Sequence, residues 1–103
     1  MTRGDVHEVR LAGRGHEQRG RRFAAIVQAD HLAFTSTVLV VPTSTQARPA
    51  TFRPEINLGG VNTRLLPEQL RVIDRALLGD RAGTLSFSEL RELDDALELV
   101  LDL

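Results

Sequence analysis

The segment Thr37-Val38-Leu39-Val40-Val41-Pro42 is the clearest secondary-structure signal in the chain. Its β-branched residues favour extended backbone, so the segment predicts a strand. Proline has no N–H to donate to a ladder, and Pro42 therefore predicts the end of that strand. The next residues, Thr43-Ser44-Thr45-Gln46, place three hydroxyls and an amide where side chains can hydrogen-bond a ligand or simply form a turn.

Further short strands are expected on both sides of this segment. Val6, Val9 and Leu11 predict a first strand, and the apolar run over residues 22–28 predicts a central strand buried on both faces. Later in the chain we expect an edge strand over residues 52–58 that is broken at Pro54, a hairpin turn at Gly59-Gly60, strands over residues 61–66 and 67–74, and a helical turn over residues 75–78.

The last segment predicts a helix with a defined start. Ser86 and, three residues later, Glu89 form a capping-box pattern. The apolar residues that follow recur at spacings of three and four and form one face: Leu90, Leu93, Leu97, Val100 and Leu101. One terminal helix after five to seven short strands, without a βαβ rhythm, predicts a mostly β fold, a small antiparallel barrel.

Length and composition exclude several classes of protein. At 103 residues the chain is expected to form one domain over residues 1–103. It has no cysteine, which excludes disulfides and thiolate metal sites, and its three isolated histidines lack metal-ligand spacing. We therefore expect no metal and no cofactor. No apolar run has membrane length and no signal peptide is recognisable, so a cytoplasmic protein without membrane contact is expected.

The charge of the chain is unevenly distributed. The net charge is −1 and all thirteen basic residues are arginine. Residues 1–53 hold eight arginines against four acids, a balance of +4, whereas residues 54–103 hold five arginines against ten acids, a balance of −5. A polyanion is therefore expected to approach the first half, provided that the two halves of the sequence form different faces.

An arginine- and glycine-rich stretch joins the first two predicted strands. It reads Gly13-Arg14-Gly15-His16-Glu17-Gln18-Arg19-Gly20-Arg21-Arg22. Such a stretch can be a solvated flexible connector. It can also be an anion site, because guanidinium groups suit phosphate and a histidine moves protons near neutral pH. The stretch by itself leaves both interpretations open.

Four motifs in this order resemble the MazF/PemK/Kid family of toxin endoribonucleases. They are Arg3-Gly4-Asp5-Val6, Gly15-His16-Glu17-Gln18 followed by Arg22, Val40-Val41-Pro42-Thr43-Ser44-Thr45, and Glu68-Gln69-Leu70-Arg71-Val72-Ile73-Asp74, and the terminal helix is similar as well. Three positions depart from the family pattern. Phe23 replaces a proline, Ser44 replaces a catalytic threonine but keeps the hydroxyl, and Leu66 stands where the Kid branch has an arginine.

The resemblance implies an SH3-like barrel of the CcdB/MazF kind and a homodimer. It also implies sequence-specific cleavage of single-stranded RNA without a metal ion, the activity of an mRNA interferase, as the toxin of a type II toxin-antitoxin system. The implied partners are the RNA substrate and a separately encoded MazE-like antitoxin, with operator DNA contacted through the antitoxin alone.

Metal-free RNA cleavage requires a base for the 2′-hydroxyl, positive charge for the phosphorane and an acid for the leaving 5′-oxygen. We expect Arg22 to supply the charge and Ser44 to hold the phosphate. His16 is expected to move protons with Glu17 or Glu68, in a direction that the sequence leaves open. RNA binding is assigned to Arg14, Arg19, Arg21, Thr43, Thr45, Gln69 and, as a base contact in a polar loop, Phe34, whereas Phe23 and Phe52 are expected in the core.

Two alternatives remain at this point. One is a CcdB-like gyrase inhibitor, although CcdB-type proteins depend on a C-terminal Trp-Gly-Ile and this chain ends Leu101-Asp102-Leu103. The other is a catalytically inactive family member that acts as an antitoxin-binding module. The His16, Glu17, Arg22 and Ser44 set favours the enzyme over this second alternative.

Overall fold

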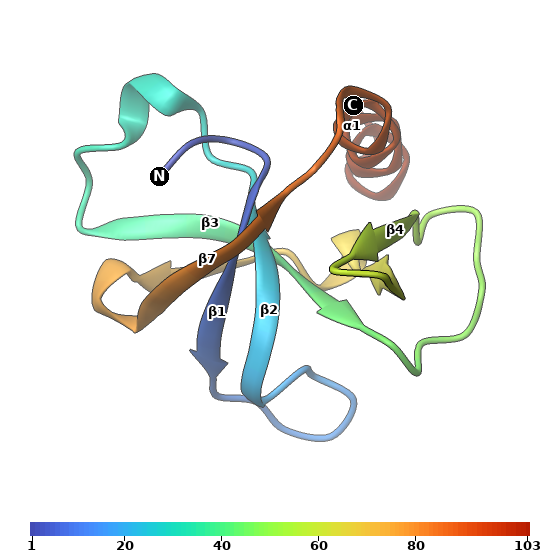
Figure 1. Ribbon diagram of the computed structural model, residues 1–103, viewed down its shortest axis with the longest axis horizontal. Coiled ribbons are helices and arrows are strands. Elements are labelled where there is room, and N and C mark those ends of the chain that lie inside the picture. The colour runs from blue at the N-terminus through green and yellow to red at the C-terminus, as the bar shows by residue number, and fades with distance from the viewer.

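Seven strands form one curled antiparallel sheet, and a single long helix covers one end of it (Figure 1). The computed structural model describes residues 1–103. The strands are β1 Asp5–Leu11, β2 Gly20–Ile26, β3 Thr37–Ser44, β4 Glu55–Leu58, β5 Val61–Leu65, β6 Arg71–Asp74 and β7 Leu78–Thr84. The helix is α1 Phe87–Leu101, and three short 3₁₀ turns are η1 Asp30–Leu32, η2 Pro67–Gln69 and η3 Arg75–Leu77.

The strand order is β4-β5-β3-β2-β1-β7, and β6 pairs with the first half of β3. Because β3 pairs with β6 at its start and with β5 at its end, the sheet curls into a half-barrel. This confirms the predicted mostly β fold with one C-terminal helix. None of the helices combines the length and the apolar character that crossing a membrane would require.

The core consists of two apolar clusters, one on each face of the sheet. Successive strand residues point to opposite faces, so neighbours such as Ala24 and Ala25 belong to different clusters. One cluster packs the sheet against Leu93 of α1, and the other fills the inside of the curl. Their buried members are Val6, Ala25, Val41, Ile56, Leu65, Leu85 and Leu93 in the first, and Val9, Leu11, Ala24, Ile26, Val38, Val40 and Ile73 in the second.

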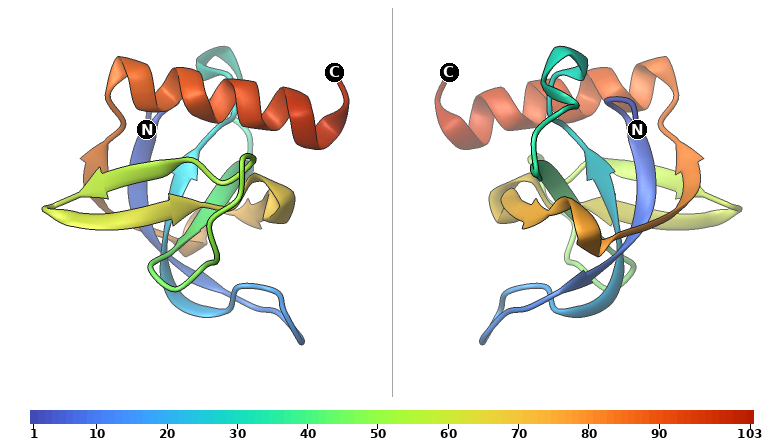
Figure 2. Two further views of the ribbon diagram at one scale, coloured as in Figure 1. Left: turned by 90° about the vertical axis from the view of Figure 1, so that its right-hand side faces the viewer. Right: turned by 90° about the vertical axis from the view of Figure 1, so that its left-hand side faces the viewer.

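Helix α1 begins as the sequence predicts. The Ser86 Oγ accepts a hydrogen bond from the Glu89 N–H at 3.1 Å, and the Glu89 carboxylate accepts one from the Ser86 N–H at 2.8 Å. The apolar face is shorter than expected. Leu93 is buried, but Leu101 is exposed because the last turn of the helix extends past the sheet (Figure 2).

The prediction that Pro42 ends its strand is wrong, since β3 continues to Ser44. Pro42 lies where β3 changes partners, after the last pair with β6 at Val40 and before the first pair with β5 at Thr43. The missing N–H therefore falls between two ladders and interrupts neither. The Pro42 carbonyl still accepts a hydrogen bond from the Leu66 N–H at 2.9 Å.

Three other expectations need correction. Residues 67–74 form η2 followed by the four-residue β6, because Pro67 starts a 3₁₀ turn. Strand β2 is buried on both faces only from Ala24 onward, and its first four residues are exposed. Strand β7 was not expected, because it contains Gly79-Asp80, which is usually a turn signal. The hairpin of β4 and β5, with β4 at the edge of the sheet, agrees with the prediction.

Candidate active site

The candidate site lies where β2 and β3 separate. Their last paired residues are Ala24 and Pro42, and the same register continued by two residues sets Arg22 opposite Ser44. Between them, the Thr43 hydroxyl donates a hydrogen bond to the Phe23 carbonyl at 2.9 Å, which ties the two strand ends together. Because side chains alternate along a strand, Arg22 and Ser44 point to one face of the sheet and Phe23 to the other.

A polar cleft of about 430 Å³ opens beside Arg22 and Ser44. It brings together His16, Arg22, Ser44, Thr45 and Gln69, five of the residues that the sequence indicated for catalysis or RNA binding. Residues to which the sequence assigned no catalytic or RNA-binding role complete the wall: Gln18, Gln46, Ala47, Arg53 and Leu66. Four distant segments of the chain thus contribute to one cleft.

Arg22 presents an uncompensated positive charge to this cleft. Its Nε donates to the Arg19 carbonyl at 3.0 Å, and no carboxylate lies within 4 Å of its guanidinium. Ser44 accepts a hydrogen bond at Oγ from the Gln46 N–H at 3.1 Å. Its hydroxyl hydrogen is therefore free to donate to an anion held by Arg22.

Arg53 supplies a second guanidinium that the sequence analysis missed. Its Nε and Nη2 contact Glu68 Oε2 at 2.7 and 2.6 Å, and its Nη1 donates to the Arg48 carbonyl at 3.0 Å. Its side chain is 25% exposed, so the group is held in one position at the cleft wall. Leu66 occupies the position at which the Kid branch has an arginine, and it lines the same cleft. Arg53 provides positive charge there from another segment.

The two glutamates that were expected to assist His16 lie outside the polar cleft. Glu17 accepts a hydrogen bond from the Arg14 N–H at 2.8 Å, and Glu68 is paired with Arg53. Both line a separate, smaller cleft of about 200 Å³. His16 is consequently the one cleft-lining side chain that can exchange protons near neutral pH.

The loop over residues 12–19 is held in place through its backbone. The Gln69 amide accepts from the Gln18 N–H at 2.6 Å and donates to the His16 carbonyl at 3.0 Å. Arg71 donates to the carbonyls of Ala12 and Gln18 at 2.6 and 2.9 Å. These bonds contradict the flexible-connector interpretation of the loop, and they engage both ends of the Gln69 amide with the loop rather than with the cleft.

Three of the side chains that were predicted to bind RNA either contact other groups of the protein or lie far from the polar cleft. Arg21 forms an ion pair with Glu8 at 2.5 Å, and the Thr43 side chain is buried with its hydroxyl on the Phe23 carbonyl. Phe34 is exposed, but it precedes β3, whereas Ser44 ends this strand, so the length of the strand separates them by about 23 Å. Phe34 is therefore not part of the cleft. Arg14 and Arg19, in contrast, are exposed in the loop and have no acidic side chain as partner.

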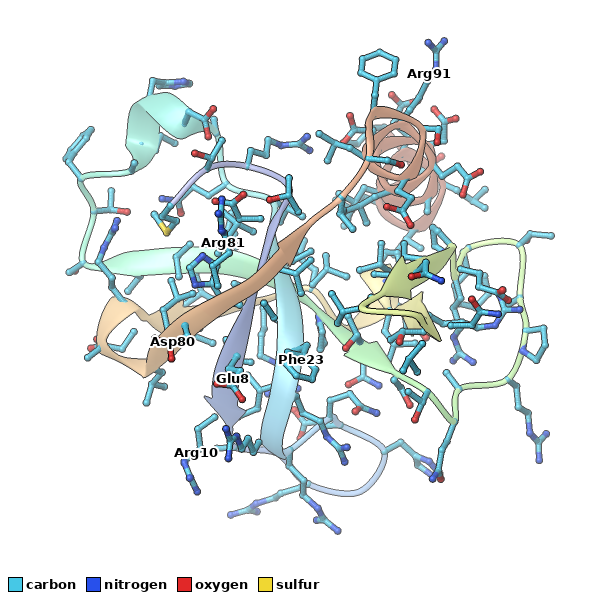
Figure 3. All side chains as sticks on the ribbon, viewed as in Figure 1. Glu8, Arg10, Phe23, Asp80, Arg81 and Arg91 are labelled. Atoms are coloured by element: carbon cyan, nitrogen blue, oxygen red, sulfur yellow. The ribbon has the colours of Figure 1, made fainter.

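A second, apolar cleft of about 410 Å³ lies on the other side of Arg22. Phe23 lines it and is 38% exposed, which corrects the expectation that this ring is part of the core. Figure 3 shows Phe23 midway along β2, away from the helix. Phe52 is half-buried, and the Arg53 guanidinium lies 5.3 Å from the centre of its ring.

The structure also separates the charges at the scale of the whole molecule. The loop over residues 12–19 and helix α1 lie at opposite ends (Figure 2). The helix carries five acidic residues and one arginine, whereas the loop has two unpaired arginines. The charge difference between the two halves of the sequence therefore becomes a difference between two ends of the molecule, and the polar cleft lies at the loop end.

Comparison with known proteins identifies relatives of the whole chain. Residues 2–101 match the family model described as the PemK-like, MazF-like toxin of type II toxin-antitoxin systems. The Mycobacterium tuberculosis protein Rv3098A, which is named as a toxin, is 41% identical over 106 residues, covering 100% of this chain and 99% of the relative. Endoribonuclease MazF9 of the same organism is 34% identical over 115 residues, covering 100% and 98%. A solved structure of an endoribonuclease in complex with its cognate antitoxin, from a mycobacterial species, has a TM-score of 0.81 at 20% identity, covering 100% of this chain and 96% of that one.

Proposed function

Because the chain belongs to the PemK-like, MazF-like toxin family of type II toxin-antitoxin systems, we propose that it is an endoribonuclease that cleaves single-stranded RNA. The observation that carries the proposal is the polar cleft, in which Arg22, free of any acidic partner, lies opposite Ser44 and shares the cleft with His16. A 34% identical relative that is named an endoribonuclease supports the same activity.

The reaction begins when the 2′-oxygen of the RNA attacks the adjacent phosphorus. The 2′-O–P bond forms while the P–O5′ bond breaks, so the products carry a 2′,3′-cyclic phosphate and a 5′-hydroxyl. The 2′-hydroxyl loses a proton to a base, and the leaving 5′-oxygen gains one from an acid. This cleavage step involves no redox change and consumes no water molecule.

Arg22 stabilises the negative charge that develops on the phosphorane. Its guanidinium can donate two parallel hydrogen bonds to the non-bridging oxygens, and the Ser44 hydroxyl can donate a third. Arg53 adds a second positive charge at the wall of the cleft, held by Glu68. In this role Glu68 orients a cation and does not itself exchange a proton.

His16 carries out proton transfer, because it is the one cleft-lining group suited to it near neutral pH. Glu17 follows His16 directly in the loop, but its carboxylate lines the smaller neighbouring cleft and accepts a hydrogen bond from the Arg14 N–H, so we assign it no proton transfer in the polar cleft. The reaction needs both a base and an acid, and His16 supplies one of the two.

A cognate antitoxin is the proposed protein partner. The support is the mycobacterial endoribonuclease that was solved with its cognate antitoxin and shares this fold. An acidic segment of such a partner would complement Arg14, Arg19 and Arg22 at the loop end of the molecule and would prevent RNA from entering the cleft.

The test of the proposed function is a digest of single-stranded RNA by the purified protein in the presence of EDTA. We expect fragments with 5′-hydroxyl and 2′,3′-cyclic phosphate ends, which end-specific ligation and sequencing would detect and assign to a sequence. Intact RNA under all conditions would contradict the enzyme and favour the antitoxin-binding alternative. Cleavage that requires an added metal ion would contradict the proposed chemistry.

Substitution of Arg22 tests the assignment of the charge. We expect Arg22→Ala to lower kcat/KM by about 10²- to 10³-fold, because a preorganised donor to the transition state is lost. The circular dichroism spectrum and melting temperature should stay unchanged, since the side chain is exposed. Arg91→Ala, on the exposed surface of α1, is the matched control and should cleave like the wild type. A folded Arg22→Ala protein with full activity would refute the role of Arg22.

A further inference from the structure

The apolar cleft beside Arg22 continues the face of the sheet that packs against α1. Phe23 lies on the same face as Ala25, a member of the apolar cluster under the helix, and Leu58 both packs against that cluster and lines the cleft. The helix does not cover this region, so the face opens to solvent at Phe23 and Val61, which are 38% and 54% exposed. An apolar surface has thus been left open next to the phosphate-binding groups.

The apolar and polar clefts meet at the point where β2 and β3 separate. Arg22, Ser44 and Thr45 line both of them. An RNA phosphate held by Arg22 and Ser44 has a nucleoside on each side, and the two clefts are the spaces available on either side. The continuity with the phosphate site therefore favours a part of the RNA strand as the occupant of the apolar cleft.

The lining of the apolar cleft has the chemistry of a base site. At about 410 Å³ it lies in the size range of small-molecule pockets, about 300 to 1,000 Å³. Phe23 offers an aromatic ring, whose backbone is fixed by the hydrogen bond from Thr43. The Thr45 hydroxyl makes no hydrogen bond within the protein and can reach the polar edge of a base. The rest of the lining combines apolar or backbone surface at Leu58, Gly59, Val61 and Ala82 with Arg21, whose guanidinium is paired with Glu8, and with the buried Thr43 and Thr63.

We propose that the apolar cleft binds a nucleobase next to the cleaved phosphodiester, with the Phe23 ring as its stacking surface. The proposal rests on the proposed function, and it moves the base contact from Phe34 to Phe23. In the family pattern this position is a proline, so the ring is a feature of this chain. Stacking on the ring accepts any base. A hydrogen bond to the Thr45 hydroxyl, in contrast, depends on which base is present.

The experiment measures the affinity for a short single-stranded RNA whose attacking ribose carries a 2′-O-methyl group, which prevents cleavage. One RNA carries all of its bases, and each of the others has an abasic nucleotide at one position along the strand. Wild type, Phe23→Ala and Phe23→Tyr are compared by fluorescence anisotropy. Phe87→Ala is the matched control, since Phe87 is an exposed phenylalanine at the start of α1 and lines neither the apolar nor the polar cleft.

We expect Phe23→Ala to weaken binding of the complete RNA by about 5- to 150-fold, the range measured for base–aromatic contacts. Removal of one particular base should weaken binding to the wild type by a similar factor and should have little further effect on Phe23→Ala. Phe23→Tyr should retain the affinity, and Phe87→Ala should bind like the wild type. If Phe23→Ala does not fold, Phe23→Leu replaces it, because leucine keeps an apolar side chain without a ring.

Two outcomes would overturn the base site. In the first, the loss of RNA affinity caused by each base removal and the loss caused by Phe23→Ala multiply, as independent effects do. In the second, Phe23→Ala binds RNA as the wild type does. If in that second case the substitution instead weakened binding of the antitoxin, the cleft would be a protein-docking site. These results are separate from the digest, because binding is measured without turnover. RNA binding that depends on Phe23, in a protein that cleaves no RNA, would support the base site and refute the proposed function.

Discussion

Arg53 and Glu68 show how one contact changes the chemistry assigned to a residue. The sequence predicts that Glu68 can take part in proton transfer with His16. In the structure its Oε2 contacts two nitrogens of Arg53, and the arginine, not the glutamate, lines the polar cleft. We therefore propose that Glu68 is a positioning residue that acts through Arg53.

A double substitution distinguishes the two roles of Glu68. We expect Arg53→Ala to lower kcat/KM by about 10²-fold, because a cation near the transition state is lost. Glu68→Gln should lower it by about 2- to 5-fold, the range for a partly exposed ion pair. If Glu68 acts only through Arg53, the double variant will be no worse than Arg53→Ala alone. Losses that multiply would return Glu68 to proton transfer.

The residues that could be predicted from the sequence are those that carry their own local motif. His16 and Arg22 lie in a glycine- and arginine-rich stretch, and Ser44 follows a strong strand signal, so each could be assigned before the structure was known. Arg53 could not, because it is an ordinary basic residue between a loop and Pro54. Its role depends on Glu68, fifteen residues away in the chain, and on the fold that brings both to the cleft.

At the scale of elements, Arg71, the first residue of β6, and Arg75, the first residue of η3, each hold a different loop. Arg71 donates to the carbonyls of the loop over residues 12–19. Arg75 donates to the carbonyls of Ala33 and Thr35 in the loop that precedes β3. The two contacts are chemically alike, but only the first is next to the polar cleft.

This pair provides a matched test of the loop. We expect Arg71→Met to speed hydrogen exchange of the amides over residues 14–18 and to lower kcat/KM by about 10-fold, because the loop that carries His16 loses two charge-assisted hydrogen bonds. Arg75→Met should speed exchange over residues 32–36 and leave cleavage unchanged. Equal activity of both variants would show that the ordering of the first loop is irrelevant to the reaction.

The elements differ in how well the sequence predicts them, for a physical reason. Helix α1 starts with a capping box that is complete within four residues, so its start could be read directly. Strand β7 has no such signal. Gly79 and Asp80 disfavour a strand, and the segment is extended because it pairs with the edge of β1, whose partner residues lie 69 to 79 positions earlier in the chain. Long-range pairing of this kind overrides local propensity.

At the scale of the whole molecule, the separation of charge bears on how the proposed RNA substrate approaches. The acidic helix and the arginine-bearing loop lie at opposite ends, so an RNA strand is repelled from one end and attracted to the other. The force on a negatively charged strand is therefore directed toward the polar cleft. Electrostatic attraction of this kind weakens as salt screens the charges.

Salt dependence of RNA binding measures this effect. If Arg14, Arg19, Arg22 and Arg53 contact phosphates, the logarithm of affinity should fall with the logarithm of salt concentration with a slope of about −2.8. Replacing both Arg14 and Arg19 with glutamine should reduce the slope to about −1.4. Arg91→Gln, on the helix, should leave it unchanged. An unaltered slope in the loop variant would mean that these two arginines make no phosphate contacts.

The loop over residues 12–19 is held almost entirely by bonds to its backbone. Gln69 and Arg71 contact carbonyls and one amide, and neither contacts a side chain of the loop. Natural selection can therefore exchange the side chains at positions 14 and 19 without disturbing the shape of the loop. A scaffold of this kind can adjust how tightly it holds an RNA backbone by point substitution, and a laboratory library restricted to these positions would be a direct route to variants with a different affinity and salt dependence.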